Sequence, residues 1–266
     1  MKTLTGSVFL ALALTTGALV QAQTFEQSLA AYERSDYRTA FAGFKKLAEQ
    51  GNAGAQFNLG LMYANGQGVP KDDQQAVVWY LKAAEQGVAV AQFNLGLRYA
   101  NGQGVPKDDQ QAVAWFRKAA EQGNAMAQGN LGGMYGTGQG VLKDDQQAVA
   151  WTHKAAEQGN AGAQNNLGVM YRDGQGVPKD DQQAVAWYRK AAEQGFADAQ
   201  HNLGLMYGNG QGVPKDDQMA YFWWLLSSAQ GNQSAVKNRD LVELRLTPEQ
   251  RAAAQAAART WQPKTK

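Results

Sequence analysis

Residues 52–87 read NAGAQFNLGLMYANGQGVPKDDQQAVVWYLKAAEQG, and the same pattern returns every 36 residues along the chain. Five full copies start at Asn52, Val88, Asn124, Asn160 and Phe196. Repeats of about 20 to 50 residues are typical of solenoid proteins, in which each short unit buries its apolar face against its neighbours. The repeat therefore predicts a stacked array of similar units.

Each copy contains two helical patterns. In the first copy, Ala55, Leu59 and Tyr63 are spaced i, i+4 and i+8, which places them on one face of a helix. The second half of the copy has five residues at i, i+3, i+4, i+7 and i+8: Ala76, Trp79, Tyr80, Ala83 and Ala84. This spacing also describes one helical face, so we predict a pair of helices in each repeat.

The residues between the two patterns favour a turn. Gly66 and Gly68 allow positive φ, and Pro70 disfavours helix at the residue before it. Asp72 stands three residues before Gln75, which is the spacing of a capping box at the start of the second helix. Gly87 supplies the left-handed position that commonly ends a helix.

A glycine recurs inside the first helix of each copy, where it costs about 1 kcal/mol relative to alanine. The five positions are Gly60, Gly96, Gly132, Gly168 and Gly204. We expect the paired helices to touch there, with the rings of Tyr63 and Trp79 filling the space beside the contact. The five tryptophans of the repeats are accordingly predicted to be core residues: Trp79, Trp115, Trp151, Trp187 and Trp223.

The ends of the chain predict caps and a leader. Residues 23–51 read as a shortened repeat, residues 52–231 as the five repeats and residues 232–266 as C-terminal capping helices, giving about fourteen helices in antiparallel pairs. Lys2 precedes an uncharged run from Val8 to Val20, so we expect residues 1–22 to be a cleavable signal peptide. That signal predicts a periplasmic or secreted protein with no membrane insertion after cleavage.

Composition excludes several functions. The chain has no cysteine, so we expect neither a lipidated cysteine nor disulfides. Its formal net charge is +2 with the charges interspersed, which disfavours nucleic acid as a partner. Two histidines without a metal-ligand spacing and GQGV turns without the Walker lysine predict no metal, no cofactor and no catalytic residues.

The repeat resembles the Sel-one-like repeat, a relative of the tetratricopeptide repeat. The matching pattern is A-x-x-x-L-G-x-x-Y, then G-x-G-V-P-x-D, then A-x-x-W-Y-x-K-A-A-x-Q-G. The resemblance implies a right-handed α-α superhelix that acts as a protein- or peptide-binding scaffold, often in the bacterial envelope or in host contact. An alternative from the same resemblance is an enzyme acting on cell-wall material, or a modulator of one.

Comparison of the five copies shows which positions the scaffold leaves free. On the first helix these positions share one face, which in tetratricopeptide-like stacks lines the groove. The first two copies place large apolar residues there: Phe57, Leu61, Phe93 and Leu97. The later copies place polar ones: Asn165, Arg172, Asp198 and His201. We expect the large residues to form an exposed apolar patch unless something covers them. A face that is apolar at one end and polar at the other suits an amphipathic or extended peptide, the alternative being ordinary solvent surface.

One asparagine recurs beside this face: Asn58, Asn94, Asn130, Asn166 and Asn202. Asparagine is a middling helix former, so its repetition calls for a reason. One hypothesis is a row of amides that pairs with the backbone of a bound peptide. The other is hydrogen bonding to the helix of the neighbouring repeat, and the sequence does not choose between them.

Overall fold

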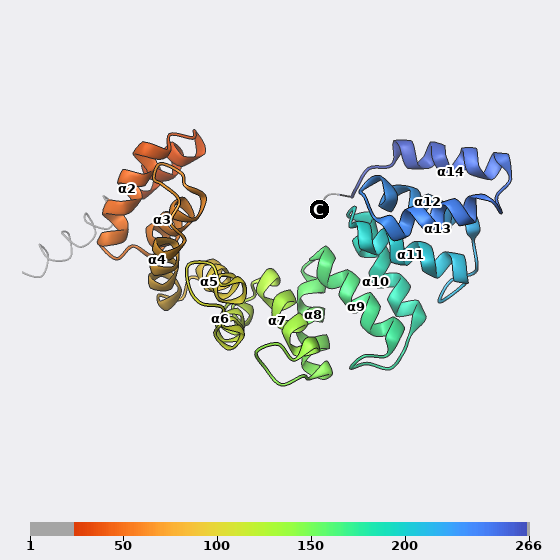
Figure 1. The fold of residues 1–266 in the computed structure, drawn as a ribbon, viewed down its shortest axis with the longest axis horizontal. Coiled ribbons are helices and arrows are strands. Elements are labelled where there is room, and N and C mark those ends of the chain that lie inside the picture. The colour runs from red at the N-terminus through yellow and green to blue at the C-terminus, as the bar shows by residue number, and fades with distance from the viewer. Residues whose placement is uncertain (1–23, 265–266) are drawn as a thin grey trace, which may run out of the picture. The chain divides into compact units, whose positions relative to one another are not determined.

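The computed structural model describes residues 24–264, and the predicted signal peptide, residues 1–22, lies outside them. The described residues form helices joined by short turns, with no strand among them (Figure 1). The chain divides into two compact units, Met1–Gln122 and Gly123–Lys266, which are described separately. No helix within the described residues is long and apolar enough to cross a membrane.

The first unit contains a helical segment over residues 24–33 and five further helices. These are α2 (Tyr37–Glu49), α3 (Ala53–Asn65), α4 (Asp73–Glu85), α5 (Ala89–Asn101) and α6 (Asp109–Glu121). Neighbours in sequence pack on each other from α2 to α6. We call α3 and α5 the leading helices of their repeats, and α4 and α6 the trailing helices.

The second unit contains the other three repeats and the C-terminal helices. Its leading helices are α7 (Ala125–Thr137), α9 (Ala161–Asp173) and α11 (Ala197–Asn209), and its trailing helices are α8 (Asp145–Glu157), α10 (Asp181–Glu193) and α12 (Asp217–Ala229). They are followed by α13 (Gln233–Glu243) and α14 (Pro248–Thr260), both packed on α12.

The tryptophans join one repeat to the preceding one. Trp115 lies in a cluster with Ala76 and Ala83 of the preceding trailing helix and Leu95 of its own leading helix. Lys118 covers the outer side of the same ring, with Nζ 3.9 Å from the ring centre, a favourable cation–π arrangement. Four of the five tryptophans are buried as predicted, whereas Trp151 is only half-buried.

A different ring packs against the helix glycine than the sequence suggested. A Cβ at Gly60 would lie 2.7 Å from the ring of Tyr80, and one at Gly168 would lie 2.6 Å from the ring of Tyr188. The prediction that Tyr63 and Trp79 fill this space was therefore wrong. The glycine is required because the ring that follows the tryptophan in the trailing helix of the same repeat packs directly against the leading helix.

The predicted turn chemistry is present. Gly66 and Gly68 have φ of 68° and 71°, and Gly87 has φ of 88°. The Asp72 side chain accepts hydrogen bonds from the backbone N–H groups of Gln74 and Gln75, both at 3.0 Å, which caps α4. The backbone N–H of Asp72 itself donates to the Tyr63 carbonyl at 2.9 Å, so it bonds to the leading helix.

A glutamine pair in each repeat was not singled out from the sequence. Gln164 is buried in α9, and its side-chain amide donates to the Ala156 carbonyl at the end of α8 at 3.0 Å. Its amide oxygen accepts from the side chain of Gln194 at 2.7 Å, at the end of α10. The same arrangement links Gln92 to Ala84 and Gln122 in the first unit. This buried amide relay ties α5 and α9 to the trailing helices on both sides of them.

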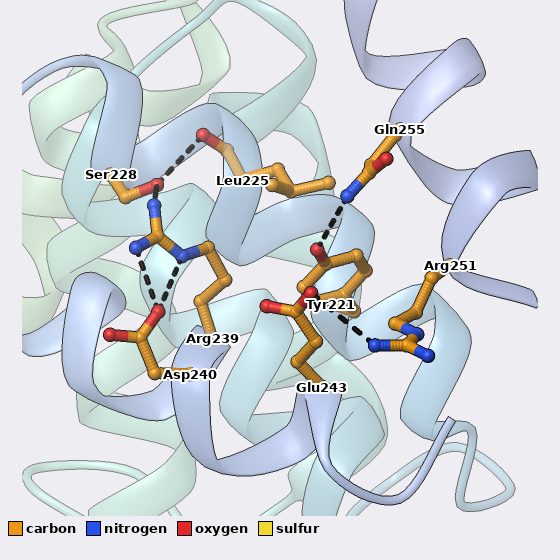
Figure 2. Close-up of polar contacts among 8 residues, drawn as sticks. All are labelled: Tyr221, Leu225, Ser228, Arg239, Asp240, Glu243, Arg251 and Gln255. Atoms are coloured by element: carbon orange, nitrogen blue, oxygen red, sulfur yellow. Dashed lines mark hydrogen bonds and ion pairs between the residues drawn. The ribbon is translucent and has the colours of Figure 1, made fainter. Parts of the chain in front are cut away.

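The C-terminal helices close the second unit with polar contacts (Figure 2). Arg239 of α13 donates to Ser228 Oγ of α12 at 3.2 Å and pairs with Asp240 at 2.7 Å. Gln255 of α14 donates to the Tyr221 hydroxyl at 3.0 Å. Thr247 and Gln250 form a capping box with Pro248 at the first helical position, so α14 begins where the sequence predicts.

Candidate functional site

The predicted binding residues lie on the leading helices, and we call the surface they form the variable face. In the first unit it belongs to α3 and α5. Phe57, Leu61 and Leu97 are half-buried, but Phe93 is only 8% exposed. Phe57 packs on Tyr80 with ring centres 6.0 Å apart, and Phe93 packs on Phe116 at 5.8 Å.

These ring contacts correct the expectation of an exposed apolar patch. The ring of each trailing helix covers much of the phenylalanine in its own repeat, so the first unit offers partly covered apolar edges. Leu61 and Phe57 also pack against the cluster formed by α4 and α5. A partner would meet the remaining edges of Phe57, Leu61 and Leu97.

An ion pair links the two repeats of the first unit. Arg98 of α5 contacts Asp73 of α4 at 2.7 Å, and its guanidinium lies 5.8 Å from the centre of the Tyr80 ring. Sequence analysis did not select Arg98, although the other four repeats have methionine at this position. Comparison of the copies would have found it.

The recurring asparagine makes a local hydrogen bond in three repeats. The side-chain amides of Asn58, Asn94 and Asn130 donate to the backbone carbonyl four residues earlier, at 2.8, 2.7 and 2.9 Å. Neither hypothesis described this bond. Asn202 instead donates to Asn165 Oδ1 of the neighbouring leading helix at 2.9 Å. In this one repeat the asparagine therefore bonds to the helix of the neighbouring repeat, as the second hypothesis predicted. The local bond uses one of the two side-chain N–H donors and involves neither the amide oxygen nor the second N–H.

The polar residues of the second unit have internal partners. Arg172 makes a two-point contact with Asp173 at 2.7 and 2.9 Å, which raises the pKa of Arg172 and lowers that of Asp173. Burial lowers the pKa of His201, and the charge of Asp198 acts weakly in the opposite direction. Asp198 is exposed and accepts from Asn232 at 3.1 Å, and Asn165 is 8% exposed.

A cavity of about 240 Å³ opens on the variable face at the third repeat. It lies between α7, α8 and α9. Its lining combines the glycine backbone of α7 with Thr152 of α8, Val169 and Met170 of α9, and polar groups that include Lys143, Asp145 and Asn166. Asn166 is exposed there, so the asparagine of the fourth repeat belongs to this cavity.

The described residues contain no group of three or more histidine, cysteine, aspartate or glutamate side chains that could hold a metal ion. The variable face instead presents apolar edges, amides and scattered charges. That chemistry suits the recognition of a polypeptide.

The five repeats decide the family. The Sel1 repeat model matches residues 53–88, 89–124, 125–160, 161–196 and 197–232. The chain belongs to the Sel1 repeat family. Sel1 repeat proteins are generally protein-interaction scaffolds, and the family is mainly non-enzymatic.

Two solved structures support the same assignment. One is a protective antigen present in uropathogenic Escherichia coli strains, with 38% identity and a TM-score of 0.85 over 91% of this chain. This chain spans about half of that protein's length, 53%. The other is a Sel1 repeat protein from Oxalobacter formigenes, with 36% identity and a TM-score of 0.79, covering 91% of this chain and 97% of that one. The predicted all-α solenoid class is confirmed, and a comparison with curated proteins found no match.

Proposed function

We propose that this Sel1 repeat chain is an exported scaffold that binds proteins or extended peptides on the variable faces of its leading helices. The observation that carries the proposal is that constant and variable positions lie in different parts of the repeat. The glutamines of the amide relay and most core positions are the same in all five copies, while four positions on one side of each leading helix differ from copy to copy. A surface that varies on a constant framework is suited to recognition.

The contacts of the first unit describe what such a partner would meet. Half-buried edges of Phe57, Leu61 and Leu97 supply apolar area, and Asn58 and Asn94 lie beside them with amide groups able to pair with a peptide backbone. Arg98 is already paired with Asp73, so it contributes little net charge. We therefore propose that the first unit prefers apolar side chains on an extended backbone.

A peptide library displayed on phage tests this proposal on the full chain. Selected peptides are synthesised, and their affinities are measured by fluorescence anisotropy against wild type and two variants. Leu61→Arg changes the variable face, whereas Val78→Arg changes an exposed apolar residue on the trailing helix α4. We expect at least a tenfold weaker affinity for Leu61→Arg and no change for Val78→Arg. Failure to select any specific peptide, or equal loss in both variants, would refute the proposal.

Export is a separate part of the proposal. It is supported by Lys2, the uncharged run from Val8 to Val20 and the small residues before Gln23, and the relative from E. coli is a protective antigen. Expression of the full chain in a Gram-negative host followed by fractionation and N-terminal sequencing tests it. The expected product starts near Gln23 in the periplasmic or medium fraction. An uncleaved chain in the cytoplasm would contradict export.

A further inference from the structure

The third repeat lacks a ring that the other four repeats have. At the same position of the trailing helix these repeats carry Tyr80, Phe116, Tyr188 and Trp224, all at most 6% exposed. The third repeat has Thr152 there. In the first and fourth repeats this ring packs between successive leading helices, and no such ring is present between α7 and α9.

The cavity on the variable face coincides with the space of the missing ring. In the first repeat, the Tyr80 ring lies against Gly60, has Arg98 of the next leading helix over its face, and lies within electrostatic range of Asp73. The equivalent residues of the third repeat are Gly132, Met170 and Asp145, and all three line the cavity.

The leading helix α7 adds to the opening. Gly133 stands where the other repeats have leucine or valine, and a Cβ there would meet no atom within 4 Å. The remaining volume of about 240 Å³ exceeds the roughly 150 Å³ of an engineered cavity that binds benzene. It therefore has room for one substituted ring.

The lining includes polar groups that can pair with a hydroxyl on that ring. Asp145 contacts Lys143 at 3.5 Å, and its side chain is 42% exposed against 23 to 30% for its four counterparts. In the first and fourth repeats the corresponding aspartates, Asp73 and Asp181, lie near the tyrosine hydroxyls, but the Tyr188 hydroxyl and Asp181 Oδ1 make no hydrogen bond to each other, and burial raises the pKa of Tyr188 to about 12. A neutral phenol in this space can donate a hydrogen bond toward the Asp145 carboxylate.

We propose that the cavity beside Thr152 is an anchor site for an aromatic side chain of a bound peptide, preferentially tyrosine. The inference rests on the proposed function, because it names the side chain that the scaffold holds in its third repeat. The ring would replace the one that Thr152 does not supply, and its hydroxyl would bond to Asp145. The rest of the peptide would then lie over α7 and α9.

The anchor site can be tested with p-cresol, the side-chain analogue of tyrosine, without any peptide. Protein labelled at the methionine methyl groups is titrated by NMR, with the Met170 methyl as reporter in the cavity and the buried Met62 methyl as internal control. We expect a saturable shift at Met170 in the millimolar range, none at Met62, and at least threefold weaker binding of toluene, which has no hydroxyl.

Two filled variants provide the control. Thr152→Tyr restores the residue of the first and fourth repeats, and Gly133→Leu restores that of the first, second and fifth. Each is expected to weaken p-cresol binding at least tenfold, and Gly133→Leu keeps the test valid if Thr152→Tyr does not fold. No saturable shift at Met170 in wild type, or the same shift in both filled variants, would overturn the anchor site. Equal binding of toluene would overturn the role of Asp145.

The outcome can be separated from that of the proposed function. Peptides that bind wild type but neither contain an essential tyrosine nor lose affinity for Thr152→Tyr would leave the scaffold function standing and defeat the anchor site. A positive p-cresol titration together with a library that yields no peptide would show an aromatic-binding cavity at Thr152 and defeat the scaffold function.

Discussion

The same glycine-to-alanine change should have opposite effects at two leading helices of the second unit. Gly133 lies in α7 and Gly168 in α9, both inside 13-residue helices. A Cβ at Gly133 meets nothing within 4 Å, whereas a Cβ at Gly168 would lie 2.6 Å from two atoms of the Tyr188 ring. Gly133→Ala should therefore stabilise the protein and Gly168→Ala should destabilise it.

The magnitude follows from two terms. Alanine gains about 1 kcal/mol over glycine in a helix interior, and this gain is common to both variants. Overpacking a filled core costs about 1 to 3 kcal/mol, and this cost applies only at Gly168 because the added Cβ would meet the fully buried Tyr188 ring. The free energies of unfolding of the two variants should thus differ by about 1 to 3 kcal/mol.

Urea unfolding followed by circular dichroism measures the difference. A third protein removes the ring: in a Tyr188→Ala background, Gly168→Ala should regain most of the helix gain, because its clash partner is absent. If Gly168→Ala were as stable as Gly133→Ala, or if its cost persisted without the ring, the contact between glycine and ring would not be the reason for the glycine.

Three further predictions concern the same unit. Gln164→Leu should lower the free energy of unfolding by about 1 to 3 kcal/mol, because it leaves the buried hydrogen-bond partners of Gln164 unsatisfied. Gln182→Leu, on the exposed side of α10, should change it by less than about 0.5 kcal/mol. Equal effects of the two variants in urea unfolding would contradict the relay. Asp180→Ala should cost about 1 kcal/mol by removing the cap of α10, and unchanged thermal stability would refute that role. Because burial lowers the pKa of His201 in the folded chain, the unfolded chain binds the extra proton first, so stability should decrease as pH falls below 6.5 until the folded histidine also titrates. His201→Asn should remove part of that decrease in thermal scans from pH 7.5 to 5, and identical pH profiles would count against it.

Most of the fold could be predicted because its signals are local and repeated five times. Helix spacing, the aspartate cap at Asp72 and the left-handed glycines at Gly66 and Gly87 each act within a few residues. The choice of ring beside Gly60 was wrong because it depends on packing between helices. Trp79 and Tyr80 are neighbours about 100° apart on one helix, so periodicity does not reveal which faces the preceding repeat and which faces its own.

The binding face was less predictable than the fold. One hypothesis gave the recurring asparagines a role in binding a peptide. In three repeats, however, the side chain donates to a backbone carbonyl of its own helix, a local bond that short polar side chains often make. Gln164 and its equivalents were not predicted from the sequence. Glutamine is a good helix former, so a glutamine that recurs in a helix needs no special explanation. The cavity depends on residues of three helices and becomes visible only when they are assembled.

The close approach of the turns has a consequence for how such a chain can change length. A Cβ at Gly104 would overlap the carbonyl of Asp73 in the preceding repeat, and Gly176 and Gly212 stand in the same relation to Asp145 and Asp181. At each of these three contacts the backbone of one repeat touches the backbone of the preceding repeat. One inserted or deleted residue would therefore shift the register between the two repeats and break the contact. Gain or loss of whole modules keeps every junction intact, and we expect tolerated length variants of this chain to differ by multiples of 36 residues.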